Sequence, residues 1–262
     1  HLLNVARLAR DFAVPFQGEE VAYLCGLLHD LGKFHHLFQE YLEKQAKGEN
    51  AKSVPHAIWG AALVYQIYWR NMRHPELWKL IALPSAGHHA GLHSSASLSL
   101  TLEERIEKQQ PFFLELLQNA EPFLREIVFP HIQKEWKIPS FTKTEREMWI
   151  RMVFSALVDA DYLDTELHFQ PALAQARRQE ISVEDLWKSL ATDQQKLIEK
   201  AENTTVNRVR REVYEACVQS ASRPQGVFRL TVPTGGGKTR SGLAFALKHA
   251  AEHQLDRGIV AI

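Results

Sequence analysis

Between residue 1 and about residue 222, apolar positions recur at the three- and four-residue spacing of helices that bury one face. The spacing predicts helices over four strongly apolar segments, residues 3–12, 21–31, 57–69 and 144–163. Polar or glycine-containing stretches separate these segments, as is usual for the connections of a helical domain. The first part of the chain is therefore predicted to be mainly α-helical.

The last of these helices carries the strongest signal. Thr144, with Glu147 three residues later, has the pattern of a capping box. The residues that follow, up to Leu163, are apolar nearly all round, which predicts a central and buried helix. Asp159 and Asp161 lie inside it and need an explanation, because an unpaired buried carboxylate is costly.

Two other segments are predicted to interrupt helices. Pro84 is expected to stop or bend the helix over residues 77–83, because proline has no N–H for a helical hydrogen bond. A turn framed by Gly87 and Gly91 follows it and holds two adjacent histidines. The serine-rich stretch 94–101 is predicted to be a loop.

The pattern changes after residue 222. A strand-like run over residues 227–232 is followed by a glycine loop over 233–239, a helical stretch over 241–251 and a second strand-like run over 258–262. The order strand, glycine loop, helix, strand is that of the opening βαβ unit of a parallel α/β sheet. We therefore expect a second kind of fold to begin here.

The composition is that of a folded globular protein, with 45% hydrophobic and 24% charged residues among 262. Lys plus Arg and Asp plus Glu number 31 each, so no overall positive field attracts nucleic acid, and any such contact must use local patches. Cys25 and Cys217 are the two cysteines, too few for a disulfide framework or a CxxC zinc site.

The cysteine usage predicts a reducing compartment, and we expect a cytoplasmic location. No apolar run reaches the roughly 18 residues that a membrane span requires, so no membrane partner is expected. The chain begins at His1 without Met and ends in the strand-like run. We expect it to be a piece of a longer polypeptide.

Candidate chemistry gathers in histidines and aspartates at five places in the chain: His1, the pair His29 and Asp30, His56, the pair His88 and His89, and Asp159 or Asp161. Imidazole and carboxylate are ligands of first-row transition metals, and one carboxylate can bridge two ions. Each place alone has a plainer interpretation, such as a satisfied core pair, a solvated turn or a helix start. Seven such groups together suit two ions.

The order of these residues resembles the HD superfamily of metal-dependent phosphohydrolases. It is more similar to the HD nuclease domain of the CRISPR-associated helicase-nucleases of type I systems, through the tandem His88 and His89 and through the segment 154–163 that contains Asp161. The resemblance extends over essentially the whole chain. It implies a helical HD-type nuclease domain over residues 1–200.

The resemblance also implies a role for each residue. Asp161 is preferred to Asp159 because the family's aspartate precedes an aromatic residue, as Asp161 precedes Tyr162. Asp30 would bridge the ions, and a water activated between them would attack phosphorus while Lys33 contacts the scissile phosphate. One ion would be held by His1, His29, Asp30 and Asp161, and the other by Asp30, His56, His88 and His89. Manganese, iron, cobalt, nickel and zinc all remain open as the metal.

The glycine loop resembles motif I of superfamily-two helicases, although Val232 stands where the full phosphate-loop pattern has its first glycine. Backbone N–H groups of such a loop face phosphates, Lys238 would reach the β and γ phosphates, and Thr239 would bind magnesium. A plain glycine turn is the alternative. The expected nucleotide-binding residues are Thr234, Gly235, Gly236, Gly237, Lys238 and Thr239.

We therefore expect residues 201–262 to be a linker helix and the first βαβ unit of an incomplete RecA-like helicase domain. ATP and magnesium would serve the full-length helicase, because this chain ends before the acidic motif that turnover needs. A stripe of arginines, Arg208, Arg210 and Arg211, we interpret as a solvated helix face.

The expected activity is a hydrolase, a metal-dependent nuclease of CRISPR interference that cuts single-stranded DNA. It would work with an RNA-guided surveillance complex and with an ATP-driven helicase that unwinds the target; RNA as an additional substrate stays open. An HD-type phosphohydrolase that acts on small nucleotides is the main alternative. A module without catalysis, which docks onto a larger complex, is the third. His35 and His36 we interpret as surface or supporting residues.

Overall fold

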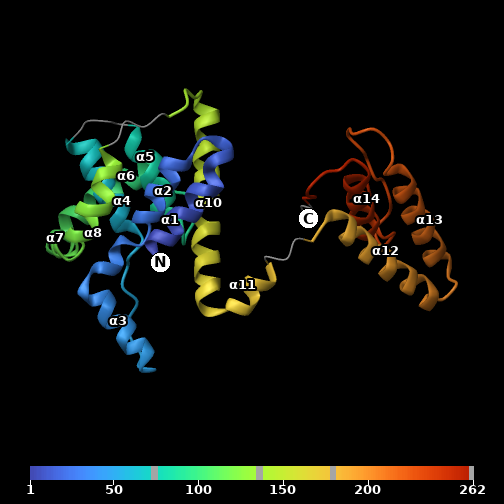
Figure 1. Ribbon diagram of the computed structural model, residues 1–262, viewed down its shortest axis with the longest axis horizontal. Helices are drawn as coiled ribbons and strands as arrows, with labels where there is room; N and C mark the ends of the chain where they lie inside the picture. Colours follow the sequence, from blue (N-terminus) through green and yellow to red (C-terminus); the bar gives the residue numbers. More distant parts are fainter. Residues whose placement is uncertain (72–75, 134–137, 178–180, 260–262) are drawn as a thin grey trace. The chain divides into compact units, whose positions relative to one another are not determined.

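The computed structural model describes residues 1–71, 76–133, 138–177 and 181–259, which are mainly helical and contain no β-strand. They divide into two compact units, His1–Gln175 and Ala176–Ile262 (Figure 1). The α-helices of the first unit are α1 (Leu2–Ala13), α2 (Glu19–Leu28), α3 (His36–Ala46), α4 (Ile58–Val64), α5 (Leu77–Gly87), α6 (Ser95–Lys108), α7 (Gln110–Asn119), α8 (Glu121–Phe123), α9 (Phe129–Ile132) and α10 (Lys143–Phe169). Short 3-10 helices η1 (Val14–Phe16) and η2 (Leu31–Phe34) and π-helical turns η3 (Tyr65–Asn71) and η4 (Leu124–Val128) complete it, and α11 (Pro171–Arg177) follows.

The centre of the first unit is α2, which is buried over most of its length. It packs against α1 on one side and against α5 and α10 on others (Figure 1). Small residues allow the closest approach, because a Cβ added at Gly26 would lie 2.4 Å from the Cα of Ala6. The apolar side chains of α1 and α2 thus form part of the core that holds the end of α2 in place.

Neither of two predicted interruptions ends a helix: α5 continues past Pro84, and the serine-rich stretch is itself helical. Pro84 lies inside α5, which continues to Gly87. Proline cannot donate to the Leu80 carbonyl, and the Cys25 thiol lies 4.0 Å from that oxygen and 3.7 Å from the Ile81 oxygen, where a weak donor partly replaces the missing bond.

The serine-rich stretch 94–101 is not a loop but the start of α6. The Ser94 side chain accepts a hydrogen bond from the Ser97 N–H at 3.2 Å, which caps the helix, and Leu98 is buried. Serine is unfavourable inside helices but favourable at the N-cap. A serine-rich run can therefore begin a helix when the residues that follow have an apolar face that becomes buried.

The helix α10 differs from its prediction in two ways. Its capping box is formed by Thr142 and Glu145 and not by Thr144 and Glu147. It is also not buried all round, because residues at four-residue spacing make an exposed stripe: Glu147, Arg151, Ser155 and Asp159. The opposite side packs on α1 and α5. Neither α10 nor any other described helix is long and apolar enough to cross a membrane.

The second unit contains α12 (Val183–Lys200), α13 (Thr205–Ser220) and α14 (Lys238–Glu252). Its helices α12 and α13 both pack on α14, so α12, which the sequence analysis assigned to the first domain, belongs to this unit. The helix expected over 241–251 is present within α14. The glycine loop precedes it.

The strand predicted over residues 227–232 is not formed. A strand needs a neighbouring strand for its backbone hydrogen bonds, and no described residue supplies one. The side chain of Val227 is fully exposed, unlike the side chains of a buried parallel strand. In the second predicted strand, residues 258–259 are not in a strand, and residues 260–262 lie outside the described residues.

Replacing Gly60 of α4 by alanine should destabilise the first unit by about 1–3 kcal/mol. An added Cβ would lie 1.9 Å from the Leu28 carbonyl oxygen at the end of α2, so one helix must move. Gly242→Ala in α14 is the control, because nothing lies within 4 Å of its added Cβ and alanine favours helices. Thermal unfolding followed by circular dichroism compares the two variants, and an equal effect of both would contradict the tight contact.

Candidate functional site

The side chains predicted as metal ligands lie together at the C-terminal end of α2. They come from the residue before α1, the end of α2, the loop before α4, the turn after α5, and α10, in the order His1, His29, Asp30, His56, His88, His89 and Asp161. Segments far apart in the sequence therefore meet at one point of the first unit.

Local backbone features bring the loops to this point. After α2 ends, η2 begins at Leu31, and a Cβ added at Gly32 would lie 2.4 Å from the backbone oxygen of His56. Only glycine lets these two segments approach so closely. On the other side, Gly91 has a φ of +92°, which ends the turn that carries His88 and His89.

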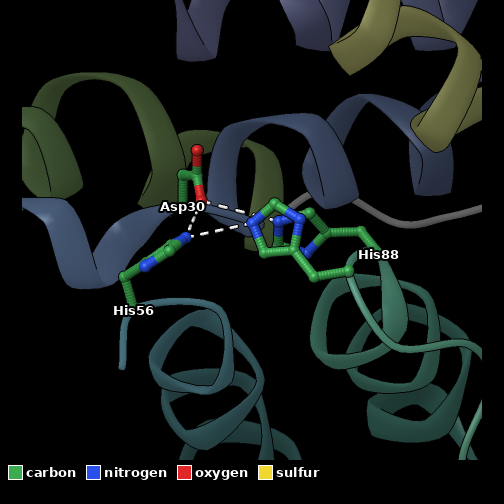
Figure 2. A group of neighbouring side chains, drawn as sticks. Asp30, His56 and His88 are labelled. Atoms are coloured by element: carbon green, nitrogen blue, oxygen red, sulfur yellow. Dashed lines mark hydrogen bonds and ion pairs between the residues drawn. The ribbon is translucent and has the colours of Figure 1, made fainter. Parts of the chain in front are cut away.

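The Asp30 carboxylate is at the centre of the cluster and is 2% exposed. Its Oδ1 faces His56 and His88, with Nε2 atoms at 3.4 and 3.5 Å (Figure 2). Its Oδ2 faces His29 at 3.3 Å and His1 at 3.6 Å. Each oxygen of one carboxylate therefore points toward its own pair of imidazoles.

A fixed hydrogen bond at Nδ1 orients four of the rings. The Nδ1 atoms of His29, His56 and His88 lie 2.9, 3.2 and 2.7 Å from the backbone oxygens of Gly26, Val54 and Ser85, and that of His1 lies 2.7 Å from Asp164 Oδ2. Carbonyl and carboxylate oxygens only accept, so each Nδ1 carries the proton. In the neutral ring the lone pair is then on Nε2, which faces the cluster in every case.

Several of these inward atoms have no hydrogen-bond partner, namely His29 Nε2, His88 Nε2 and Asp30 Oδ1. Burying such groups is costly unless something else satisfies them. Described side chains around them form three overlapping groups whose ligand atoms lie within 4.8 Å of one another: Asp30 with His56, His88 and His89, His1 with His29 and Asp30, and His29 with His88 and Asp161. A donor set of this kind fits divalent transition metals.

The two candidate aspartates of α10, Asp159 and Asp161, differ clearly in position. Asp161 Oδ1 lies 3.2 Å from His1 Nε2 and 3.6 Å from His29 Nε2. Asp159 lies on the exposed stripe of the helix, so the expectation that it is buried is wrong. The geometry thus favours Asp161, because two residues along a helix turn a side chain to another face.

The charges of the cluster are strongly coupled. Hydrogen bonds to Asp161 and Asp30 raise the pKa of His1 to about 10. Burial alone would lower the pKa of His29, but Asp161 and Asp30 raise it to about 9. Burial opposes ionisation of Asp30, yet the histidines hold its pKa well below the usual range. Because the pKa values of His1 and His29 lie above 7, both are protonated in the free protein at pH 7, and a cation must displace these protons.

Two of the histidines respond in the opposite direction. Burial lowers the pKa of His56, and burial together with the neighbouring His88 lowers the pKa of His89. The Nε2 atoms of His56 and His89 lie 3.0 Å apart. Two neutral rings whose Nε2 atoms are this close could both bind one cation.

Lys33 lies beside this cluster and not within it. Its Nζ is 2.5 Å from Asp30 Oδ2, and its side chain is about one third exposed. It also lines a cavity of about 590 Å³ that His1 and Asp30 share. The lysine therefore connects the buried carboxylate with the space outside it.

Asp164 is the residue that the sequence analysis missed. It is buried, and its Oδ2 accepts the hydrogen bond from His1 Nδ1. A carboxylate that holds the outer nitrogen of a ligand histidine fixes the ring and its tautomer. Its position three residues after Asp161, on the same helix face, was the available signal.

A further group, His35, His36 and Glu115, is not suited to a metal in this arrangement, and His35 is buried rather than on the surface. His35 Nδ1 accepts a hydrogen bond from the Leu37 N–H at 3.2 Å and caps α3. Its Nε2 then carries the proton and faces Glu115 Oε2 at 3.5 Å. A ring in this tautomer has no lone pair to offer a cation.

The glycine loop of the second unit borders a separate cavity of about 650 Å³. Gly235 and Gly237 both have a φ of +83°, and Gly237 directly precedes α14. Arg210 is not simply solvated, because its Nε donates to the Gly235 oxygen at 2.9 Å. Lys238 and Thr239 line the cavity at the start of the helix.

A comparison with protein families finds a match over the first part of the chain. The HD domain family model matches residues 1–121. This range contains His1, His29, Asp30 and the three later histidines of the cluster, and it ends before α10. A search of curated proteins found no match. HD domains are typically metal-dependent phosphohydrolases, so the match and the histidine and aspartate cluster together support a hydrolase with a divalent-metal site.

Replacing Asp164 by alanine should weaken binding of Zn²⁺ or Mn²⁺ by about 10- to 100-fold, because His1 loses the partner that orients it. Asp164→Asn should lose less, since the amide oxygen still accepts from Nδ1. Asp159→Ala is the matched control on the exposed stripe of the same helix. Titration against a competing chelator measures the affinity, and unchanged affinity in Asp164→Ala would rule out the supporting role.

Proposed function

We propose that the cluster holds two divalent transition-metal ions, with Asp30 as the bridging ligand. One ion takes His1, His29, Asp30 and Asp161, and the other takes Asp30, His56, His88 and His89. The observation that carries this proposal is that the two oxygens of Asp30 face two separate pairs of imidazoles whose Nε2 atoms are directed inward. One carboxylate with two such faces is the arrangement that a pair of ions requires.

The proposed reaction is hydrolysis of a phosphodiester, in which the bound ions activate water and neutralise charge on the reacting oxygens. Asp30 holds the two halves of the centre together, and the hydrogen bonds at Nδ1 keep the rings in place. Lys33 then binds a phosphate oxygen. Its ammonium pairs with Asp30 in the structure and also lines the cavity, from which it would reach a phosphate oxygen of a bound substrate.

Single-stranded DNA is the substrate that we propose. The glycine loop on the same chain supports a polymer substrate, because a phosphohydrolase of free nucleotides has no need of a translocating partner domain. The alternative, an enzyme that acts on small nucleotides, would use the same metal centre. The match to the HD family fits both enzymes, so only an assay of the two substrates can distinguish them.

For the second unit we propose nucleotide binding by the residues Thr234, Gly235, Gly236, Gly237, Lys238 and Thr239. Helix N-termini and glycine loops present backbone N–H groups to phosphates, and Lys238 is the first residue of α14. The cavity beside the loop also has a buried tyrosine, Tyr214, whose hydroxyl has no hydrogen-bond partner. A volume of about 650 Å³ is within the range of small-molecule sites.

In a longer protein these two activities would be coupled. We propose that ATP and magnesium drive a helicase that feeds single strand to the metal centre, and that an RNA-guided CRISPR surveillance complex exposes the target. The resemblance of the metal-ligand order and of the glycine loop to type I helicase-nucleases supports this role. Under this proposal the protein would act in antiviral defence.

The first test is cleavage of a labelled single-stranded DNA in EDTA and then with added Mn²⁺ or Ni²⁺, beside a matched assay on dNTPs. Asp30→Ala should lower metal-dependent cleavage by about 100-fold or more, because the ions contribute several kcal/mol to the barrier. Asp159→Ala should cleave like the wild type. Circular dichroism verifies that both variants keep the helical fold.

The outcomes separate the candidates. Cleavage of the DNA with dNTPs untouched supports the nuclease, whereas hydrolysis of dNTPs alone supports the nucleotide enzyme. Full activity of Asp30→Ala with metal bound would overturn the bridging role. Bound metal without hydrolysis of either substrate would leave the interaction module as the better description.

Binding of Mg-ATP to this chain tests the second unit. Lys238→Ala should weaken binding by about 10- to 100-fold, because a hydrogen bond from a charged donor to phosphate is lost. Lys248→Ala, on the same helix but away from the cavity lining, is the control. Isothermal titration calorimetry gives both affinities. Equal affinity of all three proteins would contradict phosphate binding by the loop.

A further inference from the structure

The cavity beside the metal cluster has two kinds of wall. Its lining combines charged groups of the centre with apolar and aromatic side chains. The full lining is His1, Leu2, Leu3, Asp30, Lys33, Phe34, Gln39 and Phe123. If the phosphate of a substrate binds near Asp30 and Lys33, the group attached to that phosphate therefore lies close to apolar side chains.

The aromatic part of this wall is a pair of rings from distant segments. Phe34 ends η2 and Phe123 ends α8, and their ring centroids are 5.3 Å apart with an interplanar angle of 29°. Both are half-buried and pack against the core while lining the cavity. Asn119 Nδ2 donates to the Phe34 backbone oxygen at 3.3 Å, which links the loop to the end of α7. The ring pair is thus held on a fixed support.

Aromatic faces beside a cation are what an unpaired nucleotide needs. Lys33 directly precedes Phe34, so a phosphate contact and a ring face are presented by neighbouring residues. Bases stack on aromatic side chains with little sequence preference, because every base has a π face. In a duplex the bases are already stacked and paired inside the helix, so only a single strand offers a base to such a wall.

We propose that Phe34 and Phe123 form a stacking platform that holds a base of single-stranded nucleic acid beside the metal centre. The platform makes the centre select unpaired strands over duplexes and over phosphodiesters without bases. This inference rests on the proposed nuclease function and adds the residues that determine its substrate.

The test combines two substrates with the wild type and two variants. One substrate is a labelled single-stranded oligonucleotide, and the other has the same backbone with abasic tetrahydrofuran units throughout. Phe123→Leu and Phe34→Leu keep apolar volume but remove the ring face. With Mn²⁺, either variant should raise KM for the normal oligonucleotide by about 5- to 150-fold, the value of one stacked base. KM and kcat for the abasic substrate should stay unchanged.

Two further variants separate stacking from folding. Phe123→Tyr keeps an aromatic face and should retain the wild-type KM. Phe129→Leu removes another half-buried ring that packs against the core but does not line the cavity, and it should also leave KM unchanged. An equal loss on the normal and abasic substrates in the Phe34 and Phe123 variants would overturn the platform.

A binding assay distinguishes failure of the platform from failure of the nuclease. Fluorescence anisotropy in EDTA measures the affinity of the wild type for both oligonucleotides without any turnover. Tighter binding of the normal oligonucleotide, reduced in Phe123→Leu, supports the platform even if neither substrate is cut, and only the nuclease proposal then fails. Equal affinity for both oligonucleotides in the wild type would overturn the platform directly.

Discussion

The first unit depends on one buried carboxylate that faces histidines on both sides. Asp30 is 2% exposed, and an isolated charge in such a place would be strongly unfavourable. Protonated His1 and His29 and the Lys33 ammonium offset it in the free protein. The close packing of α2 places the carboxylate there, and glycines at the surrounding loops let the partners reach it. The packing of the core thus determines the position of the site, because the charged groups meet at the end of a buried helix.

The sequence predicts the parts of this arrangement that depend on local pattern. Apolar spacing identifies the main helices, and the combination of imidazoles and carboxylates predicts a metal site, although each residue alone has a plainer interpretation. Asp164 was missed for a physical reason. Its partner, His1, lies 163 residues earlier in the chain, and only the folded structure brings the two side chains to 2.7 Å. A supporting residue has no signal of its own apart from the ligand that it supports.

The errors in the elements follow the same division. The capping box was placed two residues late because Thr142 and Thr144 both precede a glutamate by three residues, and the choice depends on where the helix enters the core. Pro84 stays helical because tertiary packing outweighs the local preference of one residue. The run at 227–232 has strand-like side chains but no described partner, and a strand is a property of two segments. In each case the missing information lies in another part of the molecule.

The separation of His1 from Asp161 and Asp164 has a consequence for assembly of the first unit. These residues stand at opposite ends of the segment that folds into it, before α1 and on α10. An ion held by both His1 and Asp161 would close a loop of nearly the whole unit, and a cross-link over a long loop removes much of the freedom of the unfolded chain. The same ion binds only when the chain is folded, so its binding free energy adds to that of folding. The supply of metal would then determine the stability of the folded unit as well as its chemistry.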